Sequence, residues 1–419
     1  MSVRNGITRF LRFCLRIFFR RIEVMGSEHL PEKGPVIFAV NHPNGLVDPL
    51  FVLCYSGRPV SFLAKAPLFH YPVIGWMVRT LDTIPVYRKQ DQSVGSNEEM
   101  FDRARSLLRR GGSIAIFPEG TTHDDPQLRE LKSGAARIAL GAGTEEVLVL
   151  PTGIYYTAKH VFRSAALMVL GEPLHVKPTG EGEPDPEQVD QLTAEIDAGL
   201  DAVTLQADSH AALSLITRAE DIFTADEDQP LAHEFGLRRR FVEGYHYLRT
   251  RDPKRLEKLQ QAIAQFEASL GRAHLDVHEL KPRISAARLF RVLILLPIAI
   301  AGAVVNYPVY TFIRVLSHRL AKGESAVLAT IKFLAALAFY PLTYLILAVV
   351  VGVRLGWAWG IVIAIVLPFV AYVTLRVFEE IDDIIGDIRG LLYPRKHLVV
   401  QRRAILAEIF DVAREMDGS

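Results

Sequence analysis

Residues 35–48 read Pro-Val-Ile-Phe-Ala-Val-Asn-His-Pro-Asn-Gly-Leu-Val-Asp, an apolar run that ends abruptly in polar and turn-forming residues. The run over residues 35–40 predicts a buried strand, because it is short, rich in β-branched and aromatic side chains, and bounded by turn residues. A histidine and a carboxylate, His42 and Asp48, follow its carboxyl end. Since chemistry in open α/β sheets gathers at the carboxyl ends of strands, this stretch predicts a functional site as well as a strand.

Three further apolar runs, over residues 81–87, 113–117 and 147–150, predict strands of the same kind. Between them, residues 97–110 and 132–141 show the apolar spacing of helices. Strands that alternate with helices of this length indicate an α/β fold, with a mixed, mostly parallel sheet flanked by helices.

His42 and Asp48 are candidates for a general base and its partner. A neutral imidazole can accept a hydroxyl proton, while a carboxylate on its other nitrogen fixes the tautomer and stabilises the imidazolium. Six positions separate the pair, so a regular helix would point the two side chains to different faces. Pro43, Asn44 and Gly45 favour a turn that can bring them together. Taken alone, such a pair is also typical of a surface turn.

A second polar stretch, Phe-Pro-Glu-Gly-Thr-Thr over residues 117–122, leaves another predicted strand. Together the two stretches resemble the signature of the glycerolipid acyltransferases, the glycerol-3-phosphate and lysophosphatidate acyltransferases, whose pattern is N-H-x4-D followed by F-P-E-G-T. Here five residues, not four, separate His42 from Asp48. Ile-Pro-Val-Tyr-Arg over residues 84–88 and Val-Leu-Pro-Thr-Gly over residues 149–153 resemble the family's second and fourth motifs, in the family's order.

The resemblance implies a role for each motif residue. His42, held by Asp48, takes the proton of a glycerol hydroxyl that attacks the thioester of acyl-CoA or acyl carrier protein. Arginine suits a phosphate because its planar fork binds two oxygens, and a glycine lets backbone amides approach an anion. No metal, other cofactor or covalent acyl-enzyme is expected. The implied substrate-binding residues are Asn41, Arg88, Glu119, Gly120, Thr121, Thr122 and Lys132, with Glu119 orienting Arg88 or the glycerol hydroxyls, and Pro151 ending a strand and shaping an acyl pocket.

Acyl transfer to glycerol 3-phosphate in phospholipid synthesis is the function that the resemblance favours. The longer first motif and the apolar C-terminal third resemble the membrane-bound glycerol-3-phosphate and dihydroxyacetone-phosphate acyltransferases of yeast type. Other acceptors stay open: lysophosphatidate, another lysophospholipid or an amino-lipid. A membrane scaffold or lipid-transfer protein with a decayed transferase domain is the alternative outside enzymes. Neither the acyl-chain length nor the oligomeric state follows from the sequence.

The composition limits the partners. Half of the 419 residues are hydrophobic and the net charge is +1, which gives no basis for nucleic-acid binding. The first 21 residues carry six arginines and no acid, interleaved with apolar residues at helical spacing. This pattern predicts a basic amphipathic helix in the bilayer interface over residues 1–24, with a helix packed on the catalytic domain as the alternative. Cys14 and Cys54 lack CxxC spacing and are interpreted as packing residues.

Three stretches without a charged residue follow in the last third: between Arg291 and Arg314, Lys332 and Arg354, and Arg354 and Arg376. Each approaches or exceeds the roughly 20 residues that span a bilayer as a helix. The second and third predict a helical hairpin whose basic flanks place its outer ends in the cytosol. The first is predicted to be re-entrant or tilted, which keeps the catalytic domain cytosolic; a full span would put the two ends of the protein in opposite compartments.

Composition shifts divide the chain into five parts. An acyltransferase domain over residues 25–180 follows the N-terminal helix, and a helical subdomain covers residues 181–284. Next comes a membrane region over residues 285–378, with two to three hydrophobic segments. The chain ends in a cytosolic tail over residues 379–419. The basic run at residues 238–240 is interpreted as a solvated face. A multi-pass protein of the bacterial inner membrane is favoured over one of the endoplasmic reticulum.

Overall fold

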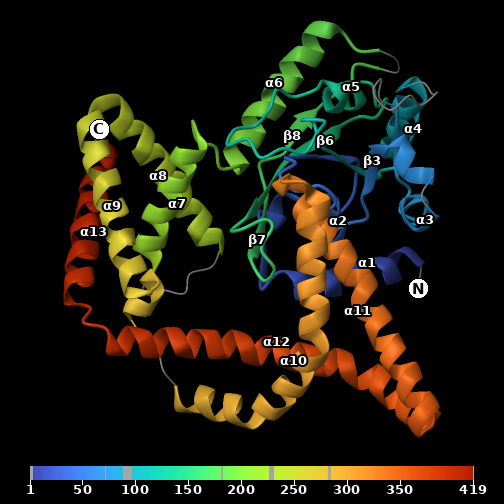
Figure 1. Cartoon of the computed structure of the whole chain (residues 1–419). Coiled ribbons are helices and arrows are strands. Elements are labelled where there is room, and N and C mark those ends of the chain that lie inside the picture. Colours follow the sequence, from blue (N-terminus) through green and yellow to red (C-terminus); the bar gives the residue numbers. More distant parts are fainter. Residues whose placement is uncertain are drawn as a thin grey trace. The chain divides into compact units, whose positions relative to one another are not determined.

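The computed structural model describes residues 3–70, 72–87, 97–180, 183–225, 231–281 and 285–418 (Figure 1). The chain divides into two compact units. Met1–Asp208 and Glu324–Thr330 form the first, and Ser209–Gly323 and Ile331–Ser419 form the second. The strands in the described ranges all belong to the first unit, whereas the second is helical.

Strands and helices alternate along the first unit, as an α/β fold requires. In chain order they are α1 (Val3–Phe18), β1 (Arg21–Met25), η1 (Ser27–His29), β2 (Val36–Val40), α2 (Val47–Tyr55), β3 (Ser61–Lys65), η2 (Ala66–His70), α3 (Pro72–Thr80), β4 (Ile84–Val86), α4 (Asn97–Arg109), β5 (Ser113–Ile116), α5 (Gly134–Leu140), β6 (Val147–Tyr156), β7 (Ala165–Leu170), β8 (Leu174–Val176) and α6 (Pro186–Val203).

The strands of the described residues form one eight-stranded sheet in the order β1-β7-β6-β2-β5-β3-β4, with β8 paired to β6. β2 lies near the middle, parallel to both β5 and β6, and β3 and β4 continue the parallel part. The pairs β6–β7 and β6–β8 are antiparallel, and β1 runs parallel to β7. The predicted α/β fold with a mixed, mostly parallel sheet is therefore confirmed.

The strand predicted over residues 35–40 is β2, whose five residues are all buried. The prediction over residues 113–117 matches β5 to within one residue. Within the prediction over residues 81–87, the strand β4 covers Ile84–Val86 alone, because Leu81 and Asp82 form the turn after α3. The two predicted helices correspond to α4 and α5.

The strand end predicted at Pro151 is wrong, because β6 runs on to Tyr156. Pro151 lies where β6 exchanges one antiparallel neighbour for another: Val149 is the last residue paired with β8, and Thr152 the first paired with β7. The carbonyl of Pro151 points to the edge of β6 that pairs with β7 and β8, since it accepts from the N–H of Gly171 at 2.8 Å. Proline is tolerated there because its missing N–H breaks no regular ladder.

Helices cover both faces of the sheet. α5 contacts α4 and α6, and α6 packs on β2 and β6, so these three helices share one face. Figure 1 shows α1 and α2, which contact each other, on the opposite side of the strands. The small side chains of Ala135, Ala136 and Ala139 are buried in α5 and allow it to approach the sheet closely.

α1 presents two apolar faces. Leu11, Leu15 and Phe18 are buried against the domain, as the packed alternative predicts. Phe10 and Phe13 are 52% and 62% exposed on another face of the same helix. One helix therefore packs on the sheet domain and still offers aromatic side chains to its surroundings.

The two cysteines lie on α1 and α2, in agreement with their interpretation as packing residues. Cys54 is buried and Cys14 is half-buried, and Cys54 Sγ lies 3.7 Å from the carbonyl of Thr8. Burial raises the pKa of Cys54 to about 12 and that of Cys14 to about 11, so both stay protonated at neutral pH.

The second unit consists of α7 (His210–Thr224), α8 (Leu231–Arg251), α9 (Pro253–Ala273), η4 (Val277–Leu280), α10 (Ala286–Ala321), most of α11 (Ser325–Leu355), α12 (Trp357–Leu392) and α13 (Lys396–Asp417). α7, α8, α9 and α13 form a bundle, which Figure 1 shows side by side. Ile263 and Phe266 of α9 share its core with Leu398 and Ile405 of α13. The last helix of the chain thus packs on helices that precede the apolar region.

The solvated face predicted for residues 238–240 is wrong for Arg238. This residue is 6% exposed and ion-paired with Glu220 of α7, which is 1% exposed. Burial lowers the pKa of Arg238 to about 10. Arg239 and Arg240 are exposed as predicted. Sequence pattern could not separate the three, because pairing with a buried acid is a tertiary contact.

α10, α11 and α12 contain the three charge-free stretches and are each long and apolar enough to cross a membrane. α11 and α12 form the predicted hairpin, in which the backbone of Gly360 approaches those of Gly352 and Ala348 around the turn at Gly356. α10 is one continuous helix of 36 residues that contains Pro297 and Pro308.

Candidate active site

Both polar stretches emerge at one edge of the sheet. β2, β5 and β6 are parallel neighbours, so their carboxyl ends lie together. β2 leads into residues 41–48 and β5 into residues 117–122, while β6 ends at Tyr156. The rings of His42 and Phe117 stack with their centroids 4.2 Å apart, so the two stretches are in direct contact.

The structure joins the predicted base and its partner. His42 Nδ1 donates to Asp48 Oδ2 at 2.8 Å, and the N–H of Asn44 donates to the same oxygen at 2.7 Å. The turn predicted from Pro43, Asn44 and Gly45 is present, with Gly45 at φ 29°. Asp48 itself lies in the first turn of α2, a helix that was not predicted. It is completely buried there, where the helix dipole favours a negative charge.

Tyr156 completes the surroundings of Asp48 and was missed by sequence reasoning. Its hydroxyl donates to Asp48 Oδ1 at 2.7 Å. Its ring stacks on Phe19 with centroids 5.5 Å apart and meets Phe51 of α2 edge-on at 6.3 Å. Burial, together with the Asp48 carboxylate, raises the pKa of Tyr156 well above its ordinary value, so the hydroxyl remains a donor. The contact joins positions 108 apart in the chain, and no local pattern marks it.

Glu119 ties the two polar stretches together. One carboxylate oxygen accepts from the N–H of His42 at 2.8 Å, and the other accepts from the N–H of Arg129 at 3.2 Å and contacts His123 Nε2. The side chain of Glu119 is 1% exposed. Both oxygens hold groups of the protein in the described residues, and the expected orienting of Arg88 or of a glycerol hydroxyl by Glu119 stays a prediction.

His123 is a second residue that sequence reasoning missed. Its Nδ1 accepts from the N–H of Asp125 at 3.1 Å, which leaves the proton on Nε2 to be donated to Glu119. The ring is 8% exposed. His123 therefore anchors the Glu119 carboxylate, and its position four residues after Glu119 was the available signal.

Gly120 and Lys132 lie against each other at the same strand end. Gly120 has φ 71°, and a Cβ added to it would come within 2.4–2.8 Å of three side-chain atoms of Lys132. Lys132 is held by its N–H, which donates to the carbonyl of Pro118 at 2.8 Å. Thr121 is exposed and Thr122 half-exposed on the same turn. An ammonium group, a glycine turn and two hydroxyls at one place can receive an anion.

Asn41 and Pro151 both contact neighbouring elements of the sheet domain. Asn41 Nδ2 donates to the carbonyl of Ile154 at 3.1 Å, and its Oδ1 accepts from the N–H of Ile154 at 2.7 Å. The amide thereby fastens the start of the loop over residues 41–46 to β6. A Cβ added to Gly199 of α6 would lie 2.5 Å from Pro151 Cγ, so the Pro151 ring faces α6.

The loop after β6 contacts the turn that contains Pro43 and Asn44. Lys159 Nζ donates to the carbonyl of Pro43 at 3.0 Å and pairs with Asp124, while Asn44 Nδ2 donates to the carbonyl of Lys159 at 3.1 Å. Burial lowers the pKa of Lys159, and the charge of Asp48 opposes that shift. Lys159 thus cross-links the turns that follow β2 and β5.

Arg88 lies outside the described residues. The preceding strand β4 is parallel to β3, and Lys65 pairs with Val86 at the carboxyl ends of these two strands. β3 is in turn parallel to β5, so Lys65 lies at the same edge of the sheet as His42 and Lys132. It is an exposed cation that sequence reasoning did not single out.

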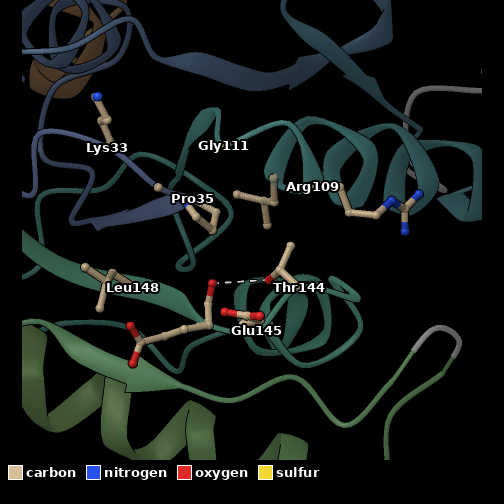
Figure 2. A pocket seen from close by; sticks show the side chains of 10 residues that line it. Lys33, Pro35, Arg109, Gly111, Thr144, Glu145 and Leu148 are labelled. Carbon is tan, nitrogen blue, oxygen red and sulfur yellow. Dashed lines mark hydrogen bonds between the residues drawn. The ribbon is translucent and has the colours of Figure 1, made fainter.

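A cavity of about 380 Å³ lies at the opposite edge of the sheet, before the amino ends of β2, β5 and β6 (Figure 2). Its lining includes Lys33, Pro35, Arg109, Gly111 and Glu145, as Figure 2 shows. Thr144 Oγ1 donates there to the carbonyl of Glu146 at 3.2 Å. The motif residues are not among those that line it, so this cavity is separate from the candidate active site.

Comparison with protein families assigns two segments of the chain. Residues 21–155 match the model of the acyltransferase family, and residues 216–416 match that of the glycerol-3-phosphate acyltransferase 2 C-terminal domain. The first match contains every motif residue named above, and the second contains most of the bundle and all three apolar helices.

Among curated relatives, an uncharacterized acyltransferase of Schizosaccharomyces pombe is 24% identical over 97% of this chain and 80% of its own length. Glycerol-3-phosphate O-acyltransferase 1 of Saccharomyces cerevisiae is 25% identical over 80% of this chain, which spans 59% of that relative. A 1-acyl-sn-glycerol-3-phosphate acyltransferase of Borreliella burgdorferi is 32% identical over 40% of this chain and 66% of its own length.

Proposed function

We propose, from the premise that this chain belongs to the acyltransferase family, that it transfers a fatty acyl group to the hydroxyl of glycerol 3-phosphate in phospholipid synthesis. The observation that carries the proposal is the His42–Asp48 pair, joined at 2.8 Å, at the strand edge where Lys132 lies across Gly120. The His42–Asp48 pair supplies a base, and Lys132 with the Gly120 turn supplies a place for a phosphate.

In the proposed mechanism His42 is the general base. Its Nδ1 is bound to Asp48, which leaves Nε2 to take the proton of the acceptor's hydroxyl. The hydroxyl oxygen attacks the thioester carbonyl carbon of acyl-CoA or acyl carrier protein, and the carbon–sulfur bond breaks. The imidazolium, stabilised by the Asp48 carboxylate, returns its proton to the leaving thiolate. The acyl group passes directly to the acceptor, without a covalent enzyme intermediate.

The acceptor's phosphate is proposed to bind at the turn over residues 119–122. Lys132, Thr121 and Thr122 supply an ammonium and two hydroxyls, Gly120 lets the backbone approach, and Arg88 adds a fork of donors as the family resemblance implies. Glu119 and Asn41 hold His42 and its loop in place, and both are proposed to contribute to the acceptor's site as the resemblance implies. Pro151 remains proposed to shape the acyl pocket, acting through its contact with α6.

An assay of the purified protein with both acceptors tests the substrate. Glycerol 3-phosphate and 1-acylglycerol 3-phosphate are offered with labelled acyl-CoA and with acyl carrier protein, and kcat/KM is compared. Glycerol 3-phosphate is expected to be preferred, as the name of the Saccharomyces cerevisiae relative suggests. Preference for the lysophosphatidate would support the alternative that the Borreliella relative's name suggests.

Substitution of Arg88 separates phosphate acceptors from amino-lipids. Losing a charge-assisted hydrogen bond costs about 1.5–3 kcal/mol, so Arg88→Ala should raise the KM for glycerol 3-phosphate by about 10- to 100-fold. An unchanged KM would favour an acceptor without a phosphate.

The proposed base is tested by His42→Ala, with His175→Ala as the matched control. The side chain of His175 on β8 is 63% exposed, and it contacts Glu146 away from the site. We expect turnover to fall by about 100-fold or more in the first variant, the usual contribution of a general base, and to be unchanged in the second. Undiminished turnover in His42→Ala refutes the assignment.

We further propose that this membrane-associated protein is multi-pass, with its catalytic domain on the cytosolic face of a bacterial inner membrane rather than of the endoplasmic reticulum. The hairpin of α11 and α12 supplies the crossings. Phe10 and Phe13, exposed on α1 beside Arg9 and Arg16, suit the headgroup region, where aromatic rings enter and arginines meet lipid phosphates.

A further inference from the structure

We propose that α10 enters and leaves the membrane on one side, so that two of the three apolar helices cross it and the third does not. This inference rests on the proposed membrane location and refines it.

The helical bundle fixes the number of crossings as even. α9 precedes the apolar helices and α13 follows them, yet Ile263 and Phe266 of the first share a buried core with Leu398 and Ile405 of the second. Arg255 of α9 also pairs with α13, at 2.8 Å from Glu415. A shared core cannot form through a bilayer, so both helices lie on one side of it. Three crossings between them are therefore excluded.

The start of α11 shows which helix does not cross. Residues 324–330 belong to the first unit, where Leu328 and Ala329 are buried and Thr330 Oγ1 accepts from the N–H of Leu46 at 2.9 Å. Leu46 lies in the turn between His42 and Asp48, so α11 begins on the side of the catalytic domain. The chain also passes from α6 to α7 through residues 204–209, with no apolar helix between. Both flanks of α10 hence lie on the same side.

The contacts of α10 indicate that its first half enters the membrane along α12 and its second half returns along α11. In its first half, Arg291 pairs with Glu380 of α12 at 2.7 Å, and Gly302 abuts Thr374 of the same helix. With rising residue number the partners on α12 thus move from its outer, charged end towards its apolar part.

The second half of α10 returns along α11. Asn306 Oδ1 accepts from the hydroxyl of Tyr344 at 2.6 Å, and Phe312 meets Phe339 at 4.9 Å, closer to the start of α11. Pro297 and Pro308 flank the change of partner, and proline is the commonest cause of a helix bend. Figure 1 shows that α10 bends between its two halves.

The charges of α10 suit this path. Arg288 and Arg291 precede its apolar part, and Arg314, Arg319 and Lys322 follow it, with no acid in the helix. Basic residues collect on the cytosolic side of membrane segments, and here both flanks are basic. At the turning point the polar group of Asn306 is satisfied, because its Nδ2 also donates to the carbonyl of Gly302 at 2.8 Å.

Side-specific labelling of single cysteines tests the inference. Cys14 and Cys54 are first replaced by serine, and one exposed residue at a time becomes cysteine: Ser285→Cys before α10, Lys322→Cys after it, Leu355→Cys in the hairpin turn and Gly418→Cys after α13. The full chain is placed in sealed vesicles and treated with a membrane-impermeant maleimide, before and after the vesicles are opened. A thermal unfolding curve that matches the parent's shows that each variant is folded, independently of the side from which it is labelled.

We expect positions 285, 322 and 418 to react from one side and position 355 from the other. Reaction of positions 285 and 322 from opposite sides overturns the inference while leaving a multi-pass protein. If position 355 reacts from the same side as the rest, the proposed crossings themselves fail. The two failures are therefore distinguishable.

Discussion

Removal of one hydroxyl, in Tyr156→Phe, tests the part of the site that no motif contains. Asp48 is buried and accepts from three donors: His42 Nδ1 at 2.8 Å, the Asn44 N–H at 2.7 Å and the Tyr156 hydroxyl at 2.7 Å. The variant removes the third and leaves Oδ1 without its partner, while Phe19 and Phe51 still hold the ring. Asp48 then keeps only the two contacts through Oδ2, so the carboxylate is less firmly oriented towards His42.

The expected loss follows from the hydrogen bond removed. A bond to a charged group contributes about 1.5–3 kcal/mol, and each 1.36 kcal/mol changes a rate tenfold, so kcat should fall by about 10- to 150-fold. Tyr156 contacts the carboxylate and not the proposed phosphate site, so the KM for both substrates should change less than about threefold.

The assay measures initial rates with labelled acyl-CoA against the concentration of each substrate. Tyr155→Phe is the matched control, because it removes the same atom from the adjacent residue of β6, whose side chain points to the opposite face of the strand. A thermal unfolding curve confirms that each variant is folded at the assay temperature. An unchanged kcat, or a loss confined to KM, would refute the positioning role of Tyr156.

Three further predictions concern the same strand edge. Glu119→Gln keeps the shape of the side chain but weakens the contacts to His42 and His123, and is expected to lower kcat by about tenfold, measured in the same assay; equal activity would show that the acyl-transfer geometry does not depend on this carboxylate. Lys132→Met should raise the KM for glycerol 3-phosphate by about tenfold and leave kcat nearly unchanged, and a loss in kcat alone would contradict a binding role. Folded Tyr156 keeps its proton above pH of about 10, where an exposed tyrosine loses it, so the folded state binds more protons and the free energy of unfolding should fall as pH rises beyond that value. Denaturant unfolding is measured at roughly pH 9 and roughly pH 11, on either side of that value. The free energy of unfolding should fall less between these two pH values in Tyr156→Phe than in the parent, and an equal fall in both would argue against the raised pKa of Tyr156.

The central sheet could be predicted because its strands are marked locally. Residues 36–40 and 113–116 are apolar runs that end in turn residues, and burial on both faces is what such runs indicate. β1 could not be found in this way, because all five residues of Arg21–Met25 are partly exposed and the strand is defined by its pairing with β7. The strand end predicted at Pro151 was wrong for a related reason. Proline cannot donate a hydrogen bond to a neighbouring strand, but Pro151 lies between the segments of β6 that pair with β8 and with β7, where no such bond is needed.

The site was predictable as far as its chemistry is carried by motifs. His42, Asp48, Gly120 and Lys132 lie as the spacing and the resemblance imply, at one edge of the sheet. Tyr156 is different, because it comes from a strand 108 positions beyond Asp48, and its role depends on register.

The placement of Asp48 on a helix has a consequence for how such proteins are found. Its position is set by where α2 begins and by how that helix packs, and the backbone of residues 43–46 merely bridges from His42 to it. A spacer of five residues therefore delivers the same 2.8 Å contact that the chemistry needs. A text search that insists on four positions between histidine and aspartate would discard this chain, whereas a search for a strand end facing a helix start would retain it. In this chain, spacer length is a property of the linker and not of the His42–Asp48 contact.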